Sequence, residues 1–155
     1  MSPPVEAAEV RGVRRFGASP EAVFDAWLDP AAVGRWLFAT PTGVMETVEL
    51  DPRVGGAFTV SERRGDVLAE HFGTFVELDR PRRLVFDFAT GRDQPLTRVT
   101  VDIRPVAGGC ELTLSHRLDP AWAAYLDRAR AGWTMVLDGL ADAVPDRWEG
   151  MRDEG

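Results

Sequence analysis

Two histidines are the side chains of this sequence best suited to acid-base chemistry near neutral pH. His116 shares a predicted strand face with Leu112 and Leu114, so we expect it to point into the protein. His71 alternates with Phe75, which gives the same expectation. An inward histidine is more often a hydrogen-bonded core residue than a catalyst, and we predict that role here. Polarising a ligand carbonyl is the alternative role for His116.

Carboxylates and other chemical motifs add little to the histidines. Glu62 shares a face with Phe58 and Val60, but it stands near the end of its strand, where we expect it to be solvated. Two histidines without nearby cysteines or carboxylates at ligand spacing argue against a metal site, and the single Cys110 cannot form an internal disulfide. The sequence contains no nucleotide-binding or hydrolase motif. We assign no catalytic residue and expect no cofactor.

A long C-terminal helix, Asp119 to Val144, is the element most able to position such residues. Asp119 followed by Pro120 is a typical helix start, because the carboxylate accepts from an orphan amide and proline suits the first turn. Apolar residues then recur at steps of three and four, which predicts one buried stripe.

The preceding chain predicts one strand, two short helices and then an antiparallel meander. Residues 9 to 17 alternate as a strand, and Ser19-Pro20 and Asp29-Pro30 each begin a short helix. From residue 44 the apolar period becomes two, with glycine- and proline-containing breaks too short for anything but hairpins. The six predicted strands are Val44 to Leu50, Ala57 to Arg63, Val67 to Leu78, Arg82 to Phe88, Thr97 to Pro105 and Cys110 to Arg117.

Length and charge restrict the partners. With 155 residues the chain predicts a single domain over residues 9 to 144, with loosely ordered termini at 1 to 8 and 145 to 155. A net charge of −7 without a basic run disfavours nucleic acid and anionic membranes. No leader or long apolar segment is present, so we expect a cytoplasmic protein, and arginine without any lysine suggests a GC-rich bacterial genome.

The element order resembles the helix-grip fold of START and Bet v 1-like domains, an α+β fold whose curved antiparallel sheet wraps a long C-terminal helix. Several local motifs narrow the resemblance: Ala18 to Trp27, Asp29-Pro30 with Trp36, Asp51 to Gly56, Gly73 to Phe75, Arg83 to Phe86, and Gly132-Trp133. Together they resemble the SRPBCC proteins grouped with the activator of heat-shock protein 90 ATPase over about residues 9 to 144. One departure is Leu37, where relatives often carry a second tryptophan.

The resemblance implies a cavity between sheet and helix that holds a small hydrophobic molecule. Any single aromatic residue is more often core, but in this fold the aromatic set favours a partly hollow interior. The predicted ligand-binding residues are Trp27, Trp36, Phe58, Phe75, Phe86, His116, Trp122, Tyr125 and Trp133.

Three functions stay open at this stage. The first is a non-enzymatic carrier, sensor or sequestering protein for the hydrophobic molecule. The second is a cyclase or dehydratase of the polyketide type, with His116, Tyr125 or Glu62 as acid and base. The third is a co-chaperone-like interaction module. The sequence also leaves homodimerisation open.

Overall fold

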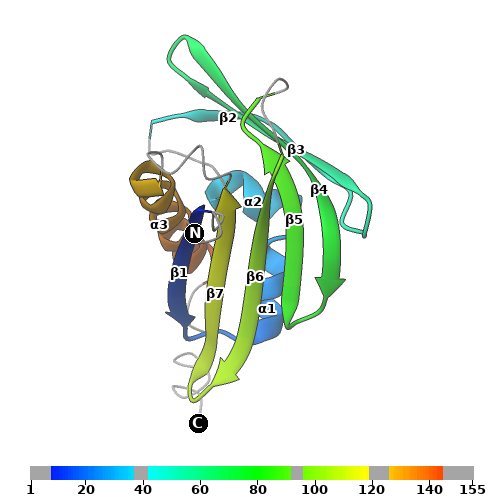
Figure 1. The fold of residues 1–155 in the computed structure, drawn as a ribbon, viewed down its shortest axis with the longest axis vertical. Coiled ribbons are helices and arrows are strands. Elements are labelled where there is room, and N and C mark those ends of the chain that lie inside the picture. The colour runs from blue at the N-terminus through cyan, green and yellow to red at the C-terminus, as the bar shows by residue number, and fades with distance from the viewer. Residues whose placement is uncertain (1–7, 37–41, 92–95, 119–125, 145–155) are drawn as a thin grey trace, which may run out of the picture.

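The computed structural model describes residues 8–36, 42–91, 96–118 and 126–144. A seven-stranded antiparallel sheet carries three helices on one face (Figure 1). In chain order the elements are β1 (Ala8–Phe16), α1 (Pro20–Ala26), α2 (Pro30–Trp36), β2 (Val44–Leu50), β3 (Ala57–Arg64), β4 (Val67–Asp79), β5 (Arg83–Ala89), β6 (Thr97–Val106), β7 (Gly109–Leu118) and α3 (Leu126–Ala143).

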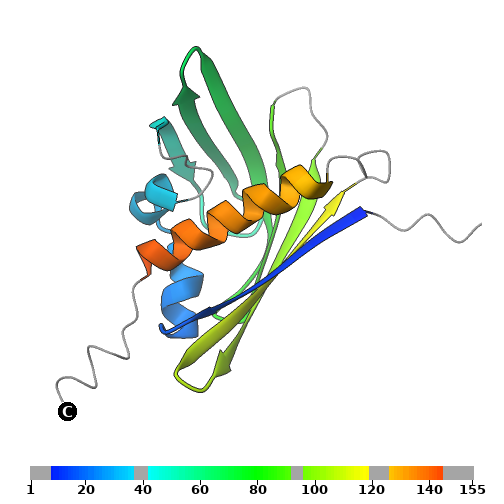
Figure 2. The ribbon, with the colours of Figure 1, turned by 90° about the vertical axis from the view of Figure 1, so that its left-hand side faces the viewer.

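The sheet order is β1-β7-β6-β5-β4-β3-β2, so β2 to β7 form a meander and β1 closes onto β7. Val10 pairs with His116 in that closing register. The sheet curves strongly, and α3 lies across its concave side next to β1 (Figure 2). This is the predicted helix-grip fold, and each predicted strand bound lies within one residue of the observed one.

The short helices begin where the sequence predicts. Ser19 caps α1, because its hydroxyl oxygen accepts from the Ala22 amide at 3.1 Å and Pro20 occupies the first turn. Asp29 accepts from the Ala31 amide at 3.0 Å in the same way. The capped α1 buries Trp27 just past its last turn. These caps fix the direction in which a large aromatic side chain enters the interior.

Helix α3 packs through one apolar stripe, which contains the buried residues Trp133, Val136, Leu137 and Leu140. Its backbone comes closest to β1 and α2, which lie at the side of the concave face. At Gly12 on β1 the two elements are close, since a Cβ there would lie 3.4 Å from a Leu137 methyl. Arg14 on β1 pairs with Asp138 on α3. The predicted helix start at Asp119 lies outside the described residues.

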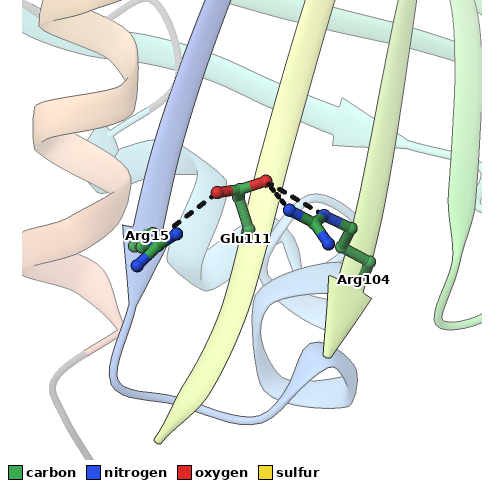
Figure 3. Close-up of polar contacts among 3 residues, drawn as sticks. All are labelled: Arg15, Arg104 and Glu111. Carbon is green, nitrogen blue, oxygen red and sulfur yellow. Dashed lines mark hydrogen bonds and ion pairs between the residues drawn. The ribbon is translucent and has the colours of Figure 1, made fainter. Parts of the chain in front are cut away.

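The outer face of the sheet is covered by ion pairs. Glu111 on β7 accepts from Arg15 on β1 at 3.1 Å and from Arg104 on β6 at 3.0 and 2.6 Å (Figure 3). The two guanidinium groups lower the pKa of the Glu111 carboxyl. The sheet therefore has a charged outer face and an apolar inner face, as the alternation predicts. Among the described helices, none is long and apolar enough to cross a membrane.

Candidate functional site

A chain of hydrogen bonds joins α3 to the sheet through His116. The indole Nε1 of Trp133 donates to His116 Nδ1 at 2.8 Å. His116 Nε2 lies 2.8 Å from the Thr97 hydroxyl, and that hydroxyl donates to the carbonyl oxygen of Phe88 at 3.4 Å. His116 is 5% exposed, so these bonds satisfy it where water has little access.

These hydrogen bonds fix the protonation state of His116. An indole N–H can only donate, so Nδ1 of His116 must be unprotonated and Nε2 must carry the hydrogen. The Thr97 hydroxyl then accepts a hydrogen bond from Nε2 and donates one to the carbonyl oxygen of Phe88. Burial lowers the pKa of His116 to about 4, which keeps the ring neutral at pH 7. His116 points inward as predicted, and both of its ring nitrogens are engaged.

Phe88 on β5 lies at the centre of a layer of rings that crosses the interior. Its ring centroid lies 5.8 Å from Trp133, 5.2 Å from His116 and 6.2 Å from His71. The Trp133 ring meets it edge to face, and the His71 ring is stacked. Since Trp133 belongs to α3 and His71 to β4, the layer connects the helix with the middle of the sheet. We call these four residues the ring layer.

An apolar cavity lies beside the ring layer and is lined by Trp27, Leu50, Phe58, Phe75, Leu84 and Phe86. Its volume is about 10 Å³, which is the space of about one water molecule. Phe58 meets Phe86 edge to face at 5.5 Å and Phe75 at 5.3 Å. The aromatic side chains that surround the cavity therefore also fill most of it.

Gly73 on β4 allows the Phe58 ring to lie where it does. Phe58 is directly opposite Gly73 in the β3–β4 ladder. A Cβ at position 73 would overlap the Phe58 ring and the backbone oxygen of Asp87. Glycine here lets an aromatic ring cover the strand itself. The cavity wall thus depends on the absence of one side chain.

An ion pair with a buried carboxylate adds a polar group to the interior. Glu62 on β3 is 2% exposed and accepts from Nε of Arg64 at 2.7 Å. The expectation of a solvated Glu62 was therefore wrong. Glu62 pairs with Met45 of β2 and Ala69 of β4, so it lies in an internal strand with neighbours on both sides. Alternation along one strand shows which face a residue takes, but it does not show how deeply that face is covered.

His71 lies next to this pair on the neighbouring strand. It is directly opposite Val60, two residues before Glu62. Burial, and after it the positive charge of Arg64, lower the pKa of His71 to about 4. A hydrogen bond to the Val60 backbone and the charge of Glu62 act in the opposite direction. His71 is therefore a second neutral imidazole, facing inward as predicted.

The structure brings together six of the nine predicted ligand-binding residues. Trp27, Phe58, Phe75 and Phe86 line the cavity, whereas His116 and Trp133 belong to the ring layer. Trp36 lies in α2, but its side chain is outside the described part, as are Trp122 and Tyr125 entirely. The prediction omitted Leu50, Leu84, Phe88 and Thr97. Alternation with Phe86 along β5 was the signal that could have added Phe88 to the set.

Other chemistry finds little support in the described residues. Cys110 is fully buried, and burial raises the pKa of its thiol to about 11, so it is no thiolate nucleophile at neutral pH. Within residues 8–36, 42–91, 96–118 and 126–144, no three His, Cys, Asp or Glu side chains are placed to hold a metal ion.

A family comparison places this architecture among known proteins. The family described as Activator of Hsp90 ATPase homolog 1-like protein matches residues 17–144. The chain belongs to this family. Membership and fold together support a domain of the ligand-binding type. A search of curated proteins finds no significant match.

Solved structures agree with the family assignment. Protein CV1439 from Chromobacterium violaceum is 26% identical, with a TM-score of 0.79 over 90% of this chain and 99% of that one. An AHSA1-like protein from Aeromonas hydrophila is 25% identical, with a TM-score of 0.75 over 88% and 91% of the two chains. A Staphylococcus aureus protein of unknown function, SA2116, is 16% identical with a TM-score of 0.80 over 90% and 94%, and shows the shared fold alone.

Proposed function

We propose that this protein binds a small hydrophobic molecule between α3 and the concave face of the sheet, without catalysing a reaction on it. The observation that carries the proposal is how that space is filled. Among the described residues, the α3 backbone approaches the sheet most closely at β1, and rings from both sides span the distance to β5. Such a space can be vacated by side-chain rotation, whereas a close backbone contact cannot.

Binding must involve rearrangement of the rings or of α3. A pocket for a drug-sized molecule holds about 300 to 1,000 Å³, far more than the cavity of about 10 Å³ beside the ring layer. Its lining is wholly apolar and mostly aromatic, which suits a hydrophobic guest. A ligand that displaces Phe58 or Phe86 would replace their contacts with its own.

The enzymatic alternative has less support. Both nitrogens of His116 are hydrogen-bonded, and Glu62 is paired with Arg64. A general base must have a lone pair within reach of the proton that it removes. These two residues are better placed to position their neighbours than to exchange protons with a substrate.

The indole N–H resonances of the tryptophans provide the test. We would titrate the protein with decanol and follow the indole signals of Trp133 and Trp27, assigned with single Phe substitutions. We expect both to shift on binding, because one lies in the ring layer and the other lines the cavity. The control signals are the backbone amides of Glu111 and Thr113 on the outer face, which should stay in place.

Native mass spectrometry of the freshly purified protein would identify any ligand already bound. Decanol, longer alcohols and flat aromatic compounds should also raise the melting temperature if the site exists. Shifts confined to outer-face amides, or no response to the whole ligand panel, would show that the interior is a filled core and that the proposal is wrong.

A further inference from the structure

The interior is polar at one place only among the inner-face positions of β3 and β4 that the structure describes. From Phe58 the inner face of β3 continues through Val60 to Glu62 and Arg64. Glu62 is 2% exposed, but the side chain of its partner Arg64 is 40% exposed. The β3–β4 hairpin extends past α3, so this end of the inner face lies beyond the cover of the helix (Figure 2). The charged group that an incoming molecule can reach is the guanidinium.

Glu62 sets the direction of that guanidinium. Oε1 of Glu62 accepts from Nε of Arg64 at 2.7 Å. Nε is the guanidinium nitrogen nearest the main chain. The two Nη groups lie at the other end, and a guanidinium offers its donors in a rigid fork that matches a carboxylate. Holding Nε in place reduces the rotamer freedom that Arg64 would lose on binding.

At His71 the charge of Arg64 outweighs that of Glu62. Both charges act on His71, and Arg64 lowers the pKa of His71 more than Glu62 raises it. His71 is neutral, so it adds no charge of its own. An anionic group next to His71 is therefore favoured over a cationic one, although the whole chain carries −7.

We propose that the ligand is an amphipathic carboxylic acid, whose carboxylate binds Arg64 beside His71 and whose apolar body extends over Val60 toward Phe58 and Phe88. This inference rests on the proposed hydrophobic site and names the chemistry at its polar end. A charge-assisted hydrogen bond to a partly buried guanidinium contributes enough to favour the acid over the matching alcohol by about tenfold or more.

The test compares decanoate, decanol and decylammonium, which share a chain and differ in charge. Dissociation constants are measured at pH 7.5, below micelle formation, by tryptophan fluorescence. Arg64→Gln alone strands a buried carboxylate and risks misfolding. The main variant is therefore the double substitution Glu62→Gln with Arg64→Gln, which removes the pair and leaves the net charge at −7.

Arg63→Gln is the matched control. Arg63 is the adjacent residue on the same hairpin, but it faces outward and pairs with Glu46. Circular dichroism and melting temperature establish that each variant is folded. We expect decanoate to bind at least about tenfold tighter than decanol in the native protein and in Arg63→Gln, and equally with decanol in the double variant.

The possible outcomes separate the two proposals. Equal binding of decanoate and decanol by the native protein, or a preference that survives in the double variant, overturns the role of Arg64 and leaves the hydrophobic site standing. Tighter binding of decylammonium shows that Glu62 is the recognising group and overturns the inference as well. Binding of none of the three compounds overturns both proposals.

Discussion

Acid should destabilise this protein through His116. The folded protein keeps the ring neutral down to a pKa of about 4, whereas the ordinary value is 6.5. Between these values the unfolded state binds more protons than the folded state, so stability rises with pH in that window. The stabilisation is complete above pH 6.5 and is lost as the pH falls toward 4. The cause of the lowered pKa is burial, which disfavours the charged ring. A proton on Nδ1 would also face the Trp133 N–H, which is itself a donor.

The size of the effect follows from the pKa difference. A difference of about 2.5 pH units corresponds to about 3.4 kcal/mol between the two protonation states. That is a large fraction of the about 5 to 15 kcal/mol by which domains of this kind are stable. His71 has a similarly low pKa and should add its own loss in the same window.

His116→Gln isolates the contribution of one ring. The glutamine amide keeps an acceptor for Trp133 and a donor for Thr97, but it does not titrate. Urea unfolding of both proteins, followed by circular dichroism from pH 8 to pH 4, gives the free energy of unfolding. We expect the native protein to lose about 3 kcal/mol more than the variant across this range.

Carboxylates with lowered pKa values, such as Asp25 beside Arg80, titrate in both proteins and cancel in the difference. Curves that run parallel from pH 8 to pH 4 would refute the reasoning, because they would mean that His116 is protonated equally in the folded and unfolded states.

Three substitutions test single contacts of the fold, two in the interior and one at a helix cap. Trp133→Phe keeps a ring but removes the donor to His116, and should lower the free energy of unfolding by about 1 to 3 kcal/mol in urea melts. Gly73→Ala forces the Phe58 ring and nearby backbone to move, and should cost about 1 to 3 kcal/mol by the same measurement. Ser19→Ala removes the cap of α1 and should cost about 1 kcal/mol, seen as a lower thermal midpoint.

Gly132→Ala is the control for the glycine substitution. A Cβ at this α3 position meets nothing within 4 Å, so alanine should leave stability unchanged or raise it. Equal effects at positions 73 and 132 would show that the Phe58 contact does not constrain β4. An unchanged melting curve for Ser19→Ala would show that Pro20 alone is enough to start α1.

The fold was predictable because its signals are local. Glycine and proline breaks mark every hairpin, and alternation between them places Leu112 and His116 on one face. The Ser19 cap is likewise written in three consecutive residues. These features depend on neighbours in the chain, which a sequence displays directly.

The site was predictable only in part, because its contacts join distant elements. Inward orientation of His116 follows from alternation, but its bond to Trp133 depends on where α3 lies across the sheet. The burial of Glu62 depends on coverage from β2 and β4. Cavity volume depends on ring rotamers such as that of Phe58, which no periodic pattern contains.

The pairing of β1 with β7 has a consequence for the order of folding. The strands β2 to β7 each pair with a neighbour in sequence, so their hairpins form as soon as both strands are available. β1 has no such neighbour, and Val10 meets His116 only after nearly the whole meander exists. During synthesis β1 must therefore wait for β7 to leave the ribosome, and α3 follows later still. We expect β1 to join the sheet late, once β7 is present, and α3 to close the interior last.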